Sequence, residues 1–147
     1  MVKLFLWVFS PRFLAFDTGD EPWQIARNVM TAEELYDEAN GEVALGNLED
    51  ALALYRQAVE ANPEFIDGWQ ALAMACLKTN RPKEAVEAAK MAVHLDPDTQ
   101  VTWTTLSLAY NKDGNVEKAE MAGAKAKVLS WGGKIAREGA RFPLEEL

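Results

Sequence analysis

Side chains suited to nucleophilic catalysis or metal binding occur singly in this sequence of 147 residues. His94 is the only histidine and Cys76 the only cysteine. Neither lies in a motif that would pair a nucleophile with a base, and together they supply too few ligands for a structural zinc site. The sequence contains no phosphate-binding loop and no dinucleotide fingerprint. We therefore predict no catalytic residue, no metal site and no cofactor, and we expect the chain not to be an enzyme.

Acidic side chains are concentrated in one stretch. The formal net charge is −8, and residues 31–63 contain eight acidic groups but one basic group, Arg56. A surface of this sign repels phosphate backbones, which argues against a nucleic-acid partner. Glu34, Glu38 and Glu42 are four residues apart and would share one face of a helix. We interpret these three as a solvated outer surface; the alternative is an acidic docking face for a basic partner.

A spacing of 34 residues recurs through the middle of the chain. Pro63 and Pro97 are separated by this step, and five further sets of residues keep it. The sets are Leu35, Trp69 and Trp103; Ala39, Ala73 and Ser107; Ala51, Ala85 and Ala119; Ala58, Ala92 and Ala126; and Gly46, Asn80 and Gly114. This order of large, small and turn-forming residues resembles the tetratricopeptide repeat (TPR), which has a period of 34 residues. The resemblance covers residues 32–131.

The resemblance implies an all-α fold, an α-solenoid of three helix–turn–helix repeats. Thr31 and Glu34 form a capping-box pattern at the start of the first helix, and the pairs should break near Gly46, Asn80 and Gly114. The first helices are expected at residues 32–45, 66–79 and 100–113, and the second helices at 48–62, 82–96 and 116–130.

Three parts of the chain are expected. Residues 1–30 would form an apolar N-terminal arm with a short helix, residues 31–131 the three repeats, and residues 132–147 a short C-terminal capping helix and tail. The capping helix is predicted over residues 134–142, because a repeat array leaves an apolar face open at its end. Ile135, Ala136 and Phe142 are the residues expected to cover that face.

Several large or reactive side chains are expected to serve packing. Trp69 and Trp103 should fill the core beside the small residues of the repeat. Cys76 aligns with Tyr110, one period later, so we interpret it as a buried apolar residue rather than a reactive thiol. His94 lies near the end of a predicted helix, where a cation suits the helix dipole, and we interpret it as structural.

The TPR resemblance also implies a partner-binding groove. In that family the first helix of each pair lines a concave surface that holds an extended peptide or a helix. Carried over by position, the lining would consist of Tyr36, Asn40, Val43, Gln70, Met74, Leu77, Lys78, Thr104, Leu108, Asn111 and Lys112. This stripe is apolar with amides and two lysines, which suits a mixed peptide. The alternative is that several of these residues pack against the second helices.

The sequence argues against one subclass of the family. TPR domains that clamp the acidic tails of heat-shock chaperones use two lysines, two asparagines and an arginine. The matching positions here are Tyr36, Asn40, Ala71, Val101 and Thr105, so one asparagine alone is kept. We therefore expect no carboxylate clamp.

The first sixteen residues are unusually apolar. The expected contact residues of this arm are Leu4, Phe5, Leu6, Trp7, Phe9, Phe13, Leu14 and Phe16. The run is too short to span a bilayer as a helix. Its expected destination is another chain or a second copy of this one; the alternatives are the concave groove and a membrane surface, which is not favoured. A further alternative is translation from Met30, which would make residues 1–29 an over-extended reading frame.

Two classes of function remain open at this point. The first is a non-enzymatic adaptor or scaffold, in the cytoplasm, that binds a protein or peptide partner in its groove. The second is an assembly subunit or secretion-type chaperone that associates through its apolar arm, for example as a homo-oligomer.

Overall fold

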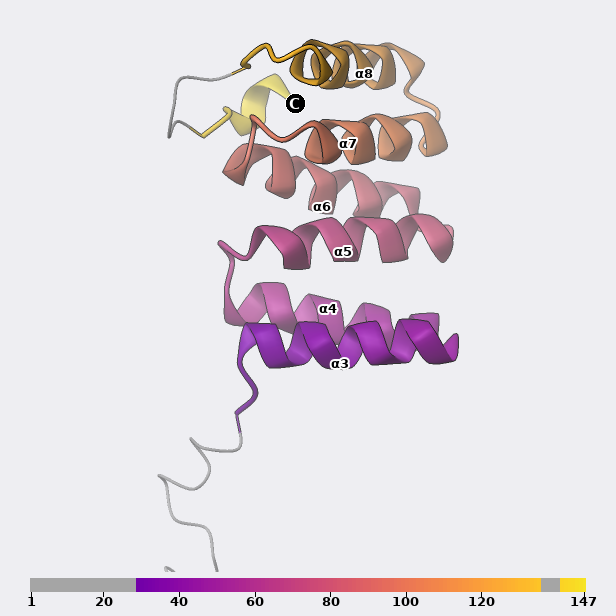
Figure 1. The fold of residues 1–147 in the computed structure, drawn as a ribbon. Coiled ribbons are helices and arrows are strands. Elements are labelled where there is room, and N and C mark those ends of the chain that lie inside the picture. Colours follow the sequence, from indigo (N-terminus) through magenta and orange to yellow (C-terminus); the bar gives the residue numbers. More distant parts are fainter. Residues whose placement is uncertain (1–28, 136–140) are drawn as a thin grey trace, which may run out of the picture. The chain divides into compact units, whose positions relative to one another are not determined.

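The computed structural model describes residues 29–135 and 141–147, and this part of the chain contains six α-helices (Figure 1). They are α3 (Ala32–Leu45), α4 (Leu48–Ala61), α5 (Ile66–Lys78), α6 (Pro82–Leu95), α7 (Gln100–Lys112) and α8 (Val116–Ser130), followed by a 3-10 helix, η1 (Leu144–Glu146). Every predicted boundary of the six helices lies within one residue of the observed one. The all-helical fold expected from the repeat is confirmed, with no strand among the described residues.

Local signals set the helix ends. The Thr31 hydroxyl accepts a hydrogen bond from the Glu34 amide at 3.2 Å, and the Glu34 carboxylate accepts one from the Thr31 amide at 2.9 Å. This is the predicted capping box. Gly46 and Gly114 have φ of +85° and +84°, and Asn80 has φ of +58°. These left-handed conformations end the first helix of each pair, and glycine adopts them without steric cost.

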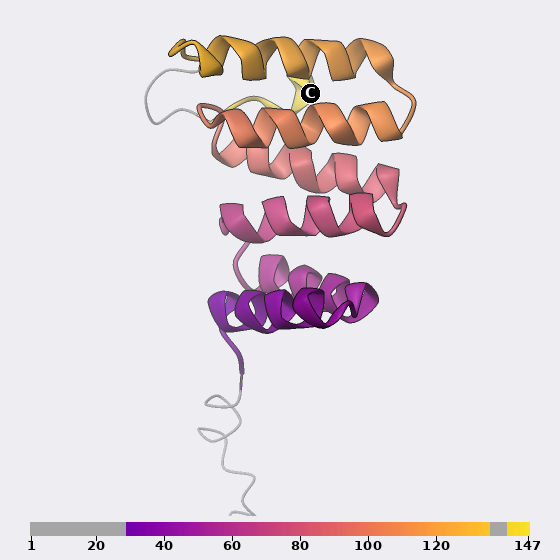
Figure 2. The ribbon, with the colours of Figure 1, turned by 45° about the vertical axis from the view of Figure 1, so that its right-hand side comes forward.

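The helices pack as three pairs. α3 packs on α4, α5 on α6 and α7 on α8, and each pair contacts the next. Figures 1 and 2 show α3, α5 and α7 following one another along the same side of the stack. Ala39, Ala51 and Ala58 are fully buried, so their small side chains let the two helices of the first pair approach closely.

The two repeat tryptophans differ in burial. Trp103 is fully buried, whereas Trp69 is only partly buried, so the expectation of two equivalent core tryptophans is wrong for Trp69. The difference has a physical cause in the C-terminal segment. Phe142 packs edge-on against Trp103, with ring centroids 5.0 Å apart and an interplanar angle of 88°. Lys125 adds a cation–π contact, 4.7 Å from the Trp103 ring.

The C-terminal cap differs from the predicted helix. Lys134, Ile135, Arg141 and Phe142 are not helical, and residues 136–140 lie outside the described residues. The predicted span of 134–142 is therefore wrong at both ends. Pro143 offers one reason, since the residue before a proline is pushed toward extended conformations. The short helix of this region is η1, directly after Pro143.

The C-terminal segment nevertheless packs on the core, beside α6 and α7. Phe142 is buried and Ile135 packs partly buried against the core. The backbone of Phe142 pairs with His94, its amide donating to the His94 oxygen at 3.1 Å and its oxygen lying 2.6 Å from His94 Nδ1. The Leu147 backbone oxygen accepts from the Tyr110 hydroxyl at 2.5 Å and from Lys118 Nζ at 2.8 Å. The structural interpretation of His94 is thus confirmed.

The arm contacts predicted for residues 4–16 lie outside the described residues, as does Ala136. Of the arm and short helix predicted within residues 1–30, only Val29 and Met30 are described, and neither is helical. Among the helices that the structure describes, none is both long enough and apolar enough to cross a membrane.

Candidate partner-binding groove

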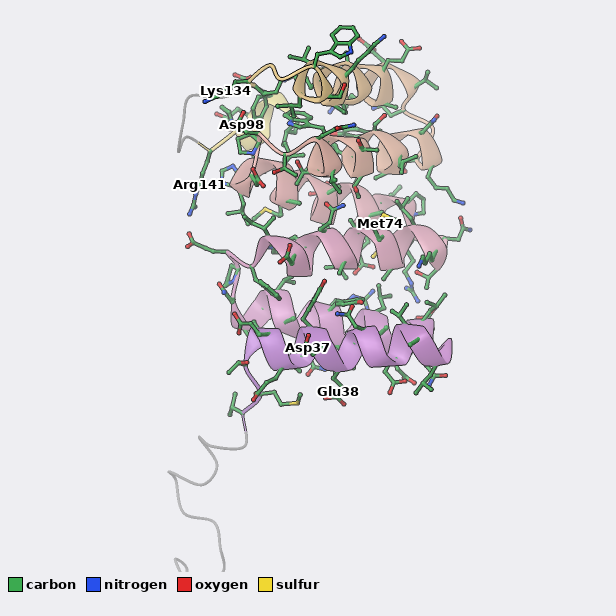
Figure 3. The ribbon with its side chains drawn as sticks, in the orientation of Figure 1. Asp37, Glu38, Met74, Asp98, Lys134 and Arg141 are labelled. Atoms are coloured by element: carbon green, nitrogen blue, oxygen red, sulfur yellow. The ribbon has the colours of Figure 1, made fainter. Side chains whose placement is uncertain are left out.

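The predicted groove residues come from α3, α5 and α7, and none of the eleven is buried. Tyr36, Val43, Gln70 and Leu77 are partly buried, while Asn40, Met74, Lys78, Thr104, Leu108, Asn111 and Lys112 are exposed. Figure 3 places Met74 on α5, and Glu38 on the side of α3 that faces away from α5. Glu38 is exposed, in keeping with its interpretation as part of an outer surface.

The α3 end of the groove is engaged in internal packing. The Tyr36 ring contacts the Tyr55 ring at 5.8 Å and the Phe65 ring at 5.3 Å. The Tyr55 hydroxyl donates to Asn40 Oδ1 at 2.6 Å. At this end Tyr36 and Asn40 therefore pack against the second helix of their pair, α4. This is the alternative interpretation of the lining residues.

Gln70 also joins helices. Its side-chain amide donates to the Thr105 hydroxyl and so links α5 to α7. Gln70 Oε1 is buried and has no hydrogen-bond donor in the described part of the chain. Gln70 is therefore a contact between neighbouring first helices, and one hydrogen-bonding site on it remains unsatisfied.

The α5 and α7 part of the groove is open. Met74, Leu108 and Val101 are 37%, 49% and 57% exposed. Val101 was not among the predicted lining residues. A sequence signal for it existed, because Val101, Thr104 and Leu108 have the i, i+3, i+7 spacing of one helix face.

Charge changes along the first helices. α3 carries the exposed acids Glu33 and Asp37, whereas α7 contains no acidic residue. Lys78 and Lys112 stand in the last turns of α5 and α7 and are exposed. A ligand in this groove would meet negative charge at α3 and positive charge at the ends of α5 and α7.

An ion pair connects the first two repeats. Arg56 on α4 makes a two-pronged contact with Glu84 on α6, with N–O distances of 2.6 and 2.7 Å. Hydrogen bonding from Arg56 lowers the pKa of the Glu84 carboxyl below its ordinary value of 4.5. Both side chains are about one-third exposed, so solvent weakens the attraction.

The single cysteine of the sequence, Cys76, lies in the core. Cys76 is fully buried, and burial raises the pKa of its thiol to about 12. The thiolate is therefore not populated at neutral pH, which agrees with its interpretation as a core residue. No cluster of three metal-binding side chains occurs among residues 29–135 and 141–147.

A pocket of about 320 Å³ opens between α7 and α8. It brings the predicted residues Thr104 and Leu108 together with Gly123 and Lys127, which sequence reasoning missed. The repeat period could have indicated this pocket, because Gly123 stands two periods after Tyr55. A glycine in place of a tyrosine leaves space between the helices.

Family comparisons agree with the fold. Residues 36–99 match the family model described as tetratricopeptide repeat, and residues 101–122 match one described as PPR repeat. The paired helices and these matches define a helical-repeat protein. Together they support a TPR-type repeat protein, and this fold supports a role as a scaffold for protein–protein contacts.

Solved TPR structures superimpose on the chain. The second TPR of Spaghetti (RPAP3), bound to the HSP90 peptide SRMEEVD, is 23% identical with a TM-score of 0.64, over 72% of this chain and 98% of that chain. The Sgt2 TPR domain from Aspergillus fumigatus is 25% identical with a TM-score of 0.64, over 71% and 69%. MamA is 19% identical with a TM-score of 0.65, over 69% and 60%. These similarities establish the fold.

Curated relatives match over a shorter stretch. Protein O-mannosyl-transferase TMTC3 of Mus musculus is 36% identical over 63 residues, and the Homo sapiens protein of that name is 35% identical over 63 residues. These residues are 43% of this chain but 7% of each relative. The chain thus spans a small fraction of their length, and the transferase activity in their name is not transferred to it.

Proposed function

We propose that this chain is a non-enzymatic scaffold that holds a peptide or a helix of a partner protein in the groove lined by α3, α5 and α7. The observation that carries the proposal is the open apolar stripe on α5 and α7, where Met74, Val101 and Leu108 are 37–57% exposed. Apolar side chains exposed along one face of a repeat array are suited to partner binding.

The chemistry of the lining favours a mixed ligand. Apolar side chains of the ligand would contact Met74 and Leu108, the Asn111 amide would bond its backbone, and acidic groups would lie near Lys78 and Lys112. We do not propose a clamp for an acidic C-terminal tail, although one structural neighbour is bound to the HSP90 peptide SRMEEVD. Asn40 accepts a hydrogen bond from Tyr55 and Thr105 one from Gln70, so both are engaged within the chain.

The test is selection of peptides from a random 16-residue phage library against the full chain. Peptides that use the groove should lose binding to the Met74→Asp variant at least about tenfold, since one buried apolar contact is replaced by a desolvated charge. The Val116→Asp variant is the matched control, because Val116 is 57% exposed on α8. Selected peptides that bind both variants as tightly as the wild type would refute the proposal.

A second candidate function rests on the sequence of the N-terminal arm. Leu4 to Phe9 form an unbroken apolar run, and an apolar patch of that size favours association with another chain. The scaffold would then assemble through this arm, as a homo-oligomer or as a subunit of a larger complex. A cytoplasmic location belongs to the same proposal.

A further inference from the structure

Each of the first two repeats is covered by the first helix of the next repeat, whereas no described α-helix covers the third repeat in this way. α5 stacks on the α3–α4 pair and α7 stacks on the α5–α6 pair. α7 and α8 are the last α-helices of the described part of the chain, and no further α-helix of that part follows them (Figure 1). The contacts that α5 and α7 make with the repeats before them therefore indicate which contacts the equivalent face of the third repeat offers to a further helix.

One such contact is a hydrogen bond from a tryptophan. Trp69 Nε1 donates to the Pro63 backbone oxygen at 2.8 Å, and Trp103 Nε1 donates to the Pro97 backbone oxygen at 2.7 Å. In both cases the donor belongs to the helix that follows. The counterpart of Pro97 in the third repeat is Trp131, and no residue in the described ranges donates to its backbone oxygen. This acceptor matches a side-chain N–H or O–H of a following helix.

A second contact is aromatic. In the first repeat the rings of Tyr55 and Tyr36 pack together, and Phe65 from the start of the next helix covers Tyr36. The counterparts of Tyr55 and Tyr36 in the third repeat are Gly123 and Thr104. The pocket of about 320 Å³ between α7 and α8 is lined by Gly123 and Thr104, at the positions that the two rings occupy in the first repeat. A space at these positions fits an aromatic side chain supplied from outside the repeat.

A third feature is the charge of the pocket. Val59 and Val93 are buried, Val59 beside Gly68 of the next helix, and their counterpart in the third repeat is the exposed Lys127. Lys127 carries the one charge among the described residues that line the pocket. Its ammonium lies 5.0 Å from the ring of Trp131, which is 76% exposed. A carboxylate is the complementary group for this position.

We propose that the open face of the third repeat, here called the end face, binds one amphipathic α-helix of a partner protein. The end face comprises Thr104, Leu108, Gly123, Lys127 and Trp131. The partner helix lies where the first helix of a fourth repeat would lie, as α5 and α7 lie on the repeats before them. It inserts an aromatic side chain into the pocket, donates to the Trp131 backbone oxygen and places a carboxylate against Lys127.

The end face is distinct from the concave groove, although Thr104 and Leu108 border both. Gly123, Lys127 and Trp131 belong to α8 and its end and were not placed in the groove. The two sites share Thr104 and Leu108, but Met74 does not line the pocket, so Met74→Asp should leave binding at the end face unchanged.

The probe is a synthetic peptide with the sequence of residues 64–80, carrying Cys76→Ser. It spans α5, which already stacks on a repeat of this chain, and it contains an aromatic residue, a carboxylate and a tryptophan: Phe65, Asp67 and Trp69. The peptide is titrated into the full, isotope-labelled chain, and amide chemical shifts are followed. We expect shifts grouped at the end face, including Gly123 and Lys127.

Two variants and one control make the test specific. Gly123→Tyr combined with Ser107→Ala rebuilds the filled space of the first repeat, where Tyr55 and Ala39 stand, and the alanine removes the Ser107 Oγ that would lie 3.3 Å from a new Cβ. This variant should weaken binding at least about tenfold. Lys127→Glu should weaken it about three- to fivefold, as an exposed charge does.

Lys83→Glu is the control, since Lys83 is exposed on α6 and lies off the end face, and it should change the affinity less than about twofold. Circular dichroism of each variant checks that it is folded. The proposal would be overturned by no shifts at a peptide concentration of about 1 mM, or by shifts confined to α3 and α4. Equal affinity of the wild type and the filled variant would overturn it as well.

Discussion

The thiol of Cys76 and the imidazole of His94 lie where they stabilise the fold. Burial raises the pKa of the Cys76 thiol to about 12, which keeps it protonated in the core. His94 bonds both backbone groups of Phe142 and so holds the C-terminal segment on α6. Single reactive residues in a helical repeat thus have packing roles when the neighbouring helices surround them.

The two repeat tryptophans should contribute differently to the free energy of unfolding, because they differ in burial. Trp103→Ala should lower the free energy of unfolding by about 3–5 kcal/mol, because a fully buried ring leaves a cavity. Trp69→Ala should cost less, since Trp69 is only partly buried. Urea unfolding measures both, with the exposed Glu38→Ala as a control that changes stability by less than about 0.5 kcal/mol. A loss for Glu38→Ala equal to that for Trp103→Ala would contradict this ranking.

Contacts between elements are of two kinds, apolar stacking and a few polar links. Buried alanines let the helices of each pair approach, while Arg56 on α4 and Glu84 on α6 connect the first repeat to the second across the stack. Because each repeat contacts only its neighbours, such links decide how cooperatively the repeats unfold.

The Arg56–Glu84 pair should make stability depend on acidity. The folded state lowers the pKa of Glu84 below the ordinary value of 4.5, so it favours the ionised form. The stabilisation is present above pH 4.5 and is lost as the pH falls through the lowered pKa. Since both groups are about one-third exposed, we expect a loss of at most about 1 kcal/mol.

The measurement is urea unfolding between pH 6 and pH 3 for the wild type and Glu84→Gln. The variant should be less stable at pH 6 and should lose less stability on acidification. Glu60→Gln, at an exposed position on α4, should follow the wild-type curve. Parallel curves for Glu84→Gln and the wild type would show that the pair contributes nothing measurable.

At the scale of the whole molecule, the solenoid presents several surfaces with different chemistry. The outer side of α3 is acidic, the groove over α5 and α7 is apolar, and the end face has a pocket beside Lys127. The proposed binding of different partners to these surfaces rests on their being spread along the array.

The N-terminal arm yields a prediction at this scale. Deletion of residues 1–29 should leave the repeats folded, because α3 to α8 pack on one another within residues 31–147. The same deletion should abolish association with a second copy or a partner, since it removes the apolar run. Light scattering of the full and the shortened chain over a range of concentrations tests this. A full chain that stays monomeric at high concentration, with no partner bound through the arm, would contradict it.

The repeat type, the helix bounds and the turns could be predicted because their signals are local. The capping box at Thr31 and the turn residues Gly46, Asn80 and Gly114 each act within a few residues of the backbone they shape, and the 34-residue period repeats these local signals along the chain. The same period led to the candidate groove residues, none of which is buried, because residues one period apart occupy equivalent places on successive helices; their use by a partner stays a prediction.

Tertiary structure alone decided which residues cover one another. Trp103 is buried and Trp69 is not, because Phe142, distant in the sequence, packs on the former. Gln70 joins two helices rather than facing the groove because Thr105 lies beside it. The pocket at Gly123 appears only when α7 and α8 are placed together. Burial and cavity shape depend on contacts between distant residues, and a repeat period specifies where a side chain stands but not what packs against it.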